Sequence, residues 1–195
     1  PSDHFGLVVV DEAHHVLADS YLNVLRHFDG HAKVLGVTAT PDRGDKKNLG
    51  KYFERVFFEV TLARLIKDGF LSPLVVKMLP VKIDLSGVKS VAGDYSADEV
   101  GARIEPWLER VAVEMGHECW DRKTIVFLPL VKTAERMTKL LNERGIECRS
   151  VSGYDDNRKE TLDWFAKAGP GSALCNSMLL TEGFDQPDVD CIVNL

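Results

Sequence analysis

The sequence predicts an α/β fold built on parallel sheets. Along its 195 residues, short apolar runs alternate with segments of helical periodicity, and a repeated order of strand, helix and strand is typical of parallel pairing. The runs at residues 5–10 and 191–195 are almost continuously apolar, as in strands buried on both faces. Hydrophobic residues make up 45% of the chain and charged residues 28%, which suits a globular protein with a sizeable core.

Six further apolar runs are expected to form strands. Each is short and rich in apolar side chains, as strands of a buried sheet are. The segment at residues 84–95 shows neither the strand period nor the helix period, so we expect a loop there. The predicted strands are residues 33–37, 56–60, 74–80, 124–128, 148–151 and 172–176.

Three segments carry helix signals. Ser96 and Glu99 have the spacing of a capping box, and the apolar stripe that follows them reaches Met115. A second helix is predicted over residues 133–144, because its apolar stripe stops just before a glycine. A third is predicted over residues 156–168, with Asp155 as its cap and a Gly-Pro pair as its end.

The predicted loop separates two α/β halves. We place the domain boundary between Phe70 and Arg122 and divide the chain into domains at residues 1–72 and 73–195. The first and last apolar runs would be central strands that need neighbours on both sides. We therefore expect both domains to be incomplete and the chain to be the middle of a longer protein.

Composition excludes several classes of protein. The four cysteines form no Cys-x-x-Cys pair, which argues against a zinc ribbon or a disulfide framework and favours a role as small buried apolar residues. The net charge of −6 gives no general attraction to phosphate, so a nucleic-acid contact must be local. No apolar run has the roughly 20 residues needed to cross a bilayer, and no signal peptide is visible. We expect a cytoplasmic protein without a membrane partner.

An acidic pair follows the first predicted strand. In an open parallel sheet, ligands bind beyond the carboxyl ends of the strands, where Asp11 and Glu12 would lie. One carboxylate can hold a magnesium ion while its neighbour accepts a proton from an attacking water. The alternative is a helix cap with acidic residues in the first helical turn.

Two hydroxyl groups follow the next predicted strand. Thr38 and Thr40 flank an alanine directly after the run that ends at residue 37. At a strand end, these hydroxyls could bridge a carboxylate such as Asp11 or Glu12 to another group. Alternatively, the Thr-Pro sequence is an ordinary strand exit. Two polar motifs after consecutive strands favour a shared site.

These motifs, in this order, resemble those of superfamily 2 helicases of the DEAH type. Asp-Glu-Ala-His at residues 11–14 resembles motif II, and Thr-Ala-Thr-Pro at residues 38–41 resembles motif III. In the second half, residues 124–129 resemble motif IV and residues 177–187 resemble motif V. The resemblance covers nearly the whole chain and is strongest to the branch of phage helicases, restriction-enzyme motor subunits and related repair translocases.

The resemblance implies two RecA-like domains of the P-loop NTPase class, with ATP and Mg²⁺ bound between them and nucleic acid lying across both. Asp11 would hold the magnesium ion, and Glu12 would position or deprotonate the attacking water. His14 would couple the nucleotide state to the opposite domain. The further implied assignments are Thr38 and Thr40 for linking hydrolysis to movement, Gly183 and Asp185 for the nucleotide, and Arg43, Pro129, Ser177 and Thr181 for nucleic acid.

The implied function is that of an ATP-dependent helicase or translocase, with DNA favoured because the matching branch mostly serves DNA metabolism. No Gly-x-x-x-x-Gly-Lys-Ser/Thr loop occurs in the sequence, although that loop holds the β- and γ-phosphates. The arginine-bearing motif VI is also missing. We therefore expect this chain alone not to hydrolyse ATP and to need the remaining segments of a parent chain.

Two other function classes stay open. The first is a non-catalytic module that binds nucleic acid or regulates a partner and has kept the fold without the phosphate loop. The second is metal-dependent hydrolysis at Asp11 and His14, which predicts bound zinc or manganese. Against zinc, His14 and His15 are adjacent and cannot both face one ion from a regular element. The oligomeric state, the direction of travel and the flanking domains lie beyond the sequence.

Overall fold

The computed structural model describes residues 3–41, 49–91, 94–177, 179–180 and 184–195. The chain forms two compact units, Pro1–Val75 and Val76–Leu195, and each is described by itself. The assignment of residues 1–72 and 73–195 to two RecA-like domains stays a prediction. Among the described residues, no helix is long and apolar enough to span a membrane.

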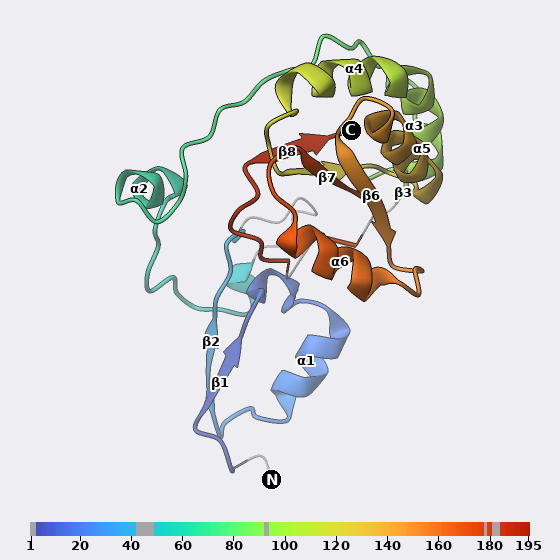
Figure 1. Ribbon diagram of the computed structural model, residues 1–195. Coiled ribbons are helices and arrows are strands. Elements are labelled where there is room, and N and C mark those ends of the chain that lie inside the picture. The colour runs from blue at the N-terminus through green and yellow to red at the C-terminus, as the bar shows by residue number, and fades with distance from the viewer. Residues whose placement is uncertain (1–2, 42–48, 92–93, 178, 181–183) are drawn as a thin grey trace. The chain divides into compact units, whose positions relative to one another are not determined.

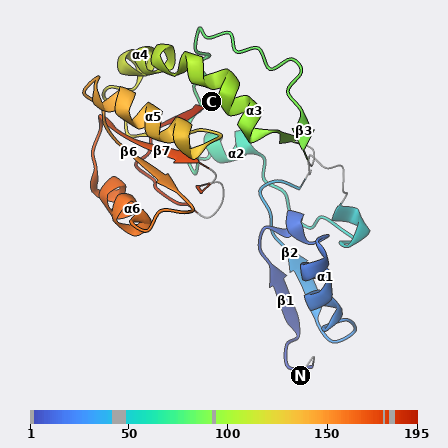
Figure 2. The same cartoon turned by 90° about the vertical axis from the view of Figure 1, so that its right-hand side faces the viewer.

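The first unit is built around two parallel strands, β1 (Leu7–Val10) and β2 (Lys33–Gly36). Helix α1 (Asp19–Arg26) connects them and lies alongside the pair (Figure 2). The buried cluster of this unit is small and consists of Val10, Ala13, Val16 and Leu25. The unit also contains two 3₁₀ turns and a short helix, namely η1 (Ala13–His15), η2 (Leu49–Lys51) and α2 (Leu62–Lys67).

The second unit contains a sheet of four parallel strands in the order β6, β7, β5, β8. The strands β6, β7 and β8 are labelled in Figure 1. After β5 the chain forms a helix and then β6, which lies two positions away from β5 in the sheet. A second helix leads from β6 to β7, which fills the position between β6 and β5. Because such crossovers are right-handed, reversing the direction places the two helices on opposite faces of the sheet. The strands are β5 (Thr124–Phe127), β6 (Glu147–Ser152), β7 (Ser172–Ser177) and β8 (Cys191–Asn194).

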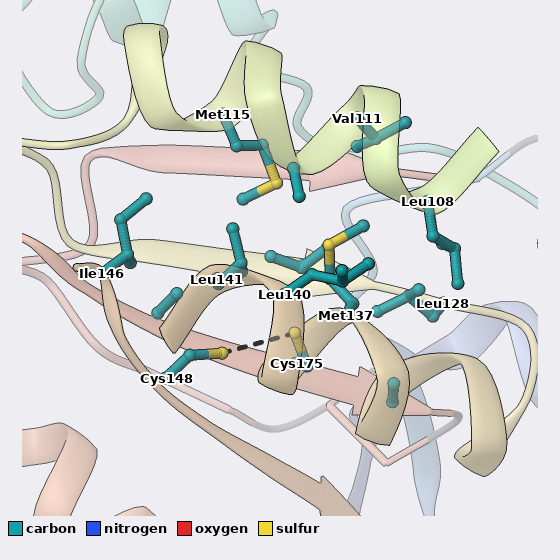
Figure 3. Packing of buried hydrophobic residues seen from close by; sticks show 14 of the residues in the cluster. Leu108, Val111, Met115, Leu128, Met137, Leu140, Leu141, Ile146, Cys148 and Cys175 are labelled. Atoms are coloured by element: carbon teal, nitrogen blue, oxygen red, sulfur yellow. Dashed lines mark hydrogen bonds between the residues drawn. The ribbon is translucent and has the colours of Figure 1, made fainter. Parts of the chain in front are cut away.

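Helices cover both faces of this sheet. Figures 1 and 2 both place α4 (Leu108–Glu118) and α5 (Val131–Asn142) on one side and α6 (Arg158–Lys167) on the other. The α4 and α5 side buries the larger cluster, including Met115, Met137 and Leu141 (Figure 3). Phe165 anchors the cluster on the α6 side. These layers confirm the predicted α/β class with parallel sheets.

The remaining elements of the second unit differ from the expected loop and single helix. A small antiparallel pair, β3 (Ser90–Val91) and β4 (Asp94–Tyr95), lies within the predicted loop. The predicted first helix is divided into α3 (Ala97–Ile104), a 3₁₀ turn η3 (Glu105–Trp107) and α4. Pro106 is the second residue of η3 and so lies in a first helical turn, where its missing N–H costs little.

Two predicted helix caps are wrong in detail. Ser96 does precede α3, but its side chain makes no capping hydrogen bond, and Glu99 accepts a hydrogen bond from the backbone N–H of Lys89 instead. Asp155 accepts from the backbone N–H of Ser152 at 2.6 Å and so closes a turn behind it rather than capping α6. Both carboxylates are satisfied by the chain before the helix.

Two predicted strands are also wrong. Residues 56–60 and 74–80 have no strand assignment, and Phe58 and Met78 within them are 83% and 93% exposed. An apolar run becomes a strand only when a partner supplies its hydrogen bonds. The expectation that β1 is buried on both faces is wrong as well, because Leu7 and Val9 are 54% and 56% exposed.

Candidate active site

The carboxyl ends of β1 and β2 are held together by backbone hydrogen bonds. The N–H of Val37 donates to the carbonyl of Val10, and the N–H of Ala13 donates to the carbonyl of Val37, both at 2.9 Å. The polar residues that follow the two strands therefore meet at one edge of the sheet, where parallel α/β proteins bind ligands.

Gly36 permits this close approach. A Cβ atom at this position would lie 2.8 Å from the Cβ of Ala13 and would overlap the ring of Phe53. Since real Cβ atoms do not come so close, a side chain here would push β2 away from the turn after β1. The sequence signal was the glycine inside an apolar run.

Glu12 adopts a left-handed backbone conformation, with φ 47° and ψ 49°. Its N–H donates to Asp11 Oδ1 at 2.9 Å. Although Glu12 precedes the turn η1, its carboxylate makes no capping hydrogen bond. The geometry therefore gives no support to the alternative that the acidic pair serves as a helix cap.

His14 is the centre of the polar cluster. Its Nδ1 lies 3.0 Å from Thr38 Oγ1, 3.3 Å from Thr40 Oγ1 and 3.2 Å from Glu12 Oε2. The N–H of Thr40 also donates to Thr38 Oγ1 at 3.1 Å. The two predicted motifs are thus brought together, and the threonine hydroxyls reach the histidine, which in turn contacts the carboxylate.

One nitrogen cannot bond all three oxygens in the same way. A carboxylate only accepts, so His14 Nδ1 must carry a proton to bond Glu12, whereas it can accept from a threonine hydroxyl only when it carries none. When the proton leaves Nδ1, His14 therefore loses Glu12 as a hydrogen-bond partner and can accept from Thr38 or Thr40 instead. The cluster can connect the charge state at Glu12 to the segment after β2.

The residues fit a magnesium ion of the kind that keeps most of its water and phosphate ligands. Asp11 is exposed and uses one lone pair of Oδ1 on the N–H of Glu12, so further carboxylate lone pairs remain for a hard cation. Among the described residues, no group of three or more His, Cys, Asp or Glu side chains is placed to hold a metal ion by itself.

In the second unit, two predicted nucleic-acid residues lie at neighbouring strand ends. Ser177 is the last residue of β7 and pairs in register with Ser152 of β6. Pro129 follows β5, and the preceding residue, Leu128, donates its N–H to the carbonyl of Asn176 at 2.9 Å. The carboxyl edge of this sheet therefore brings Pro129 and Ser177 near each other.

Asn176 was not predicted from the sequence and shapes the chain after β7. Its side chain is fully buried, and its Oδ1 accepts from the N–H groups of Leu179 and Leu180 at 3.0 and 3.1 Å. An asparagine at a strand end is a recognised turn former, which is the signal that could have found it.

The remaining predicted residues lie apart or are not described. Asp185 is exposed in the segment that leads to β8. Arg43, Thr181 and Gly183, all predicted for nucleic acid or nucleotide, lie outside the described residues. Among the described residues, the structure therefore brings Glu12, His14, Thr38 and Thr40 together in the first unit and Pro129 and Ser177 in the second.

Many ligand-binding proteins are parallel-sheet α/β proteins with polar residues after their strands. Comparison with known sequences shows which of them this chain resembles. The family described as "Type III restriction enzyme, res subunit" matches residues 1–43. The family described as "Helicase conserved C-terminal domain" matches residues 108–195. Two different families thus match the N-terminal and the C-terminal part of the chain.

The similar curated proteins include helicases and a restriction enzyme subunit. The putative mitochondrial ATP-dependent helicase irc3 of Schizosaccharomyces pombe is 30% identical, over 97% of this chain and 32% of that protein. The putative ATP-dependent helicase IRC3 of Saccharomyces cerevisiae is 27% identical, over 96% of this chain and 29% of that protein. The type I restriction enzyme EcoAI endonuclease subunit of Escherichia coli is 28% identical, over 98% of this chain and 27% of that protein.

These matches confirm the resemblance to superfamily 2 helicases along nearly the whole chain. The chain spans about a third or less of the length of these three relatives.

Proposed function

We propose that the protein is an ATP-dependent helicase or translocase and that this chain forms the central part of its motor. The observation that carries the proposal is the contact of His14 Nδ1 with Glu12, Thr38 and Thr40 at 3.0 to 3.3 Å. This contact joins an acidic pair suited to nucleotide hydrolysis to a second segment that could transmit the nucleotide state.

In this proposal, Asp11 holds Mg²⁺, which when bound neutralises phosphate charge. Glu12 orients the attacking water and accepts its proton. Because Glu12 Oε2 lies 3.2 Å from His14 Nδ1, a proton gained or lost at Glu12 changes the partner that His14 prefers. His14 thereby passes the hydrolytic state to Thr38 and Thr40. Gly183 and Asp185 are the further residues that we propose for nucleotide binding.

We further propose that the polymer is DNA and that Arg43, Pro129, Ser177 and Thr181 lie along it. Pro129 and Ser177 support this part, since they share the carboxyl edge of one sheet. The similarity to a restriction enzyme subunit along nearly the whole chain favours DNA. A cytoplasmic location also belongs to the proposal.

The test is Glu12→Gln in the complete protein that carries this chain. The substitution keeps the size of the side chain but removes the proton acceptor, so ATP turnover stimulated by nucleic acid should fall by about 100-fold or more. Binding of the nucleotide should be retained. Stimulation by duplex DNA, single-stranded DNA and RNA, each measured separately, identifies the polymer.

Glu54→Gln is the matched control, because Glu54 is an exposed carboxylate of the same unit. It should leave turnover unchanged. Thr38→Val should preserve much of the turnover and abolish movement along the polymer, since it removes only the hydroxyl that reaches His14. Full turnover in Glu12→Gln would contradict the proposed role and would favour a non-catalytic module.

A further inference from the structure

The second unit contains two pairs of neighbouring thiols. Cys119 Sγ lies 3.6 Å from Cys191 Sγ, and Cys148 Sγ lies 3.5 Å from Cys175 Sγ. All four cysteines are free thiols. The two pairs have nearly the same sulfur separation, but they differ in exposure and in the backbone that carries them.

The first pair is partly open and joins the end of a helix to the start of a strand. Cys119 follows α4 and is 3% exposed, whereas Cys191 begins β8 and is only partly buried. Cys119 is followed by a turn that leads to β5. A residue at a helix end next to a turn can adjust more easily than one inside a paired strand.

The second pair is buried, and both of its cysteines lie within paired strands. Cys148 and Cys175 are 4% and 0% exposed, and they lie diagonally on neighbouring strands, with Cys148 opposite Ala173 and Cys175 opposite Ser150 (Figure 3). Closing the sulfurs to a bonding distance of about 2.05 Å would strain two paired strands. A solute oxidant also has no open path to either sulfur.

We propose that Cys119 and Cys191 form a redox modification site, in which hydrogen peroxide oxidises Cys191 and Cys119 then forms a disulfide with it. The proposal does not depend on the proposed motor function. It assigns a role to two thiols for which that function has no use.

Electrostatics favour Cys191 as the attacking sulfur. The hydrogen bond from the Cys119 thiol, helped by the charge of Arg122, lowers the pKa of Cys191 to about 6 despite its partial burial and the nearby Asp190 carboxylate. The same hydrogen bond, together with burial, raises the pKa of Cys119. At neutral pH, Cys191 is therefore mainly the thiolate, which is the nucleophilic form.

The oxidation has two balanced steps. In the first, the Cys191 thiolate attacks one peroxide oxygen, an S–O bond forms, the O–O bond breaks, and the hydroxide that leaves takes a proton to become water. In the second, Cys119 gives up its proton and attacks the Cys191 sulfur, so that the S–S bond forms and the second oxygen leaves as water. Two thiols thus lose two electrons and two protons to one molecule of hydrogen peroxide.

The second step is helped by the first. The strongest cause that keeps Cys119 protonated is its hydrogen bond to Cys191. Once Cys191 is a neutral sulfenic acid, this cause disappears, and Cys119 can lose its proton. The pair therefore works as an attacking and a resolving thiol.

The experiment treats the folded protein at pH 7 with hydrogen peroxide, blocks the remaining thiols by alkylation, and maps the peptides by mass spectrometry. We expect two of the four thiols to be lost, in one peptide that links Cys119 to Cys191. Dithiothreitol should restore both. Cys148 and Cys175 should remain reduced and should react with the alkylating reagent only after unfolding.

Variants separate the two roles. Cys119→Ser keeps a hydrogen-bond donor beside Cys191 but cannot form a disulfide, so it should leave a Cys191 sulfenic acid that dimedone traps. Cys191→Ala should abolish both the trapping and the disulfide. Cys148→Ala is the matched control and should leave the linked peptide unchanged. If a variant fails to fold, the alkylation map of the unsubstituted protein decides alone.

Three results would overturn the proposal. These are a disulfide that maps to Cys148 and Cys175, retention of all four thiols under peroxide, and dimedone trapping at Cys119 rather than Cys191. Loss of ATP turnover in any variant would bear only on the proposed function.

Discussion

At the scale of single residues, the position of Glu12 combines chemistry with backbone strain. Among the described residues, Glu12 is the one non-glycine residue with a positive φ. Left-handed backbone costs an L-residue roughly 1–2 kcal/mol, because the Cβ atom crowds the following carbonyl oxygen. Strained backbone is typical of functional sites, where the orientation of a side chain matters more than the stability of the fold. Glu12, a candidate proton acceptor, fits this description.

This strain can be measured by comparing Glu12→Gly with Glu12→Ala. Both substitutions remove the carboxylate, but only glycine is free of the Cβ crowding. The glycine variant should therefore be more stable than the alanine variant by about 1 kcal/mol in urea unfolding of the first unit. Asn23, an exposed position inside α1, provides the control. There the alanine variant should be more stable than the glycine variant by about 1 kcal/mol. The same order at both positions would exclude a strained Glu12.

At the scale of elements, Lys123 fixes the segment that leads to β8. Its side chain is only 3% exposed, and its ammonium lies 2.6 Å from Asp188 Oδ2 and 4.9 Å from the centre of the Phe165 ring. Its backbone N–H donates to Asp190 Oδ1 at 3.0 Å. Since a buried ammonium needs a partner, Asp188 is tied to the start of β5 and to α6.

The pair should make stability depend on pH in acid. The hydrogen bond from Lys123 holds the pKa of Asp188 below its usual value of 3.8. A carboxylate with a lowered folded pKa stabilises the native state above the unfolded pKa, and this stabilisation is lost as the pH falls through the folded pKa. Asp188→Asn should therefore lower the melting temperature at pH 7, and the difference from the unsubstituted protein should shrink below about pH 4.

Thermal melts at several pH values provide the measurement. Lys123→Met combined with Asp188→Asn should remove the acid-sensitive difference, because neither charge remains. A difference for Asp188→Asn that stays constant from pH 7 to pH 3 would show that the ion pair contributes nothing to the pH dependence.

At the scale of the whole molecule, the two units have very different cores. Counting only the residues that the structure describes, the first unit buries a cluster of four hydrophobic residues, whereas the second buries clusters of sixteen and five. Buried apolar area is the main stabilising contribution to folding. The second unit is therefore the more stable part of this chain.

Hydrogen exchange followed by mass spectrometry tests this difference in stability between the two units. Amides of β5, β6 and β7 should exchange at least about tenfold more slowly than those of β1 and β2, because local opening requires less energy where less apolar surface is buried. Equal protection in both sheets would contradict the expectation. Peptides from residues 56–60 and 74–80 provide the unprotected reference, since these segments have no strand partners in the described structure.

The sequence by itself determined the α/β class and all six strands of the two parallel sheets to within two residues at their ends. It also determined that α5 stops shortly before Gly145, which has φ 82°. It also placed Glu12, Thr38 and Thr40 at one sheet edge. These features follow from local patterns, because the alternation of apolar runs and turns fixes where parallel strands end.

Only the tertiary structure decided which partner each polar group and each apolar run would find. Asp155 and Glu99 accept hydrogen bonds from the chain before their helices, residues 56–60 remain without a strand partner, and Asn176 folds the turn after β7. The physical reason is that periodicity reports which surface a segment could bury, whereas a hydrogen bond, an ion pair or a thiol pair needs a second group that the fold brings from elsewhere in the chain.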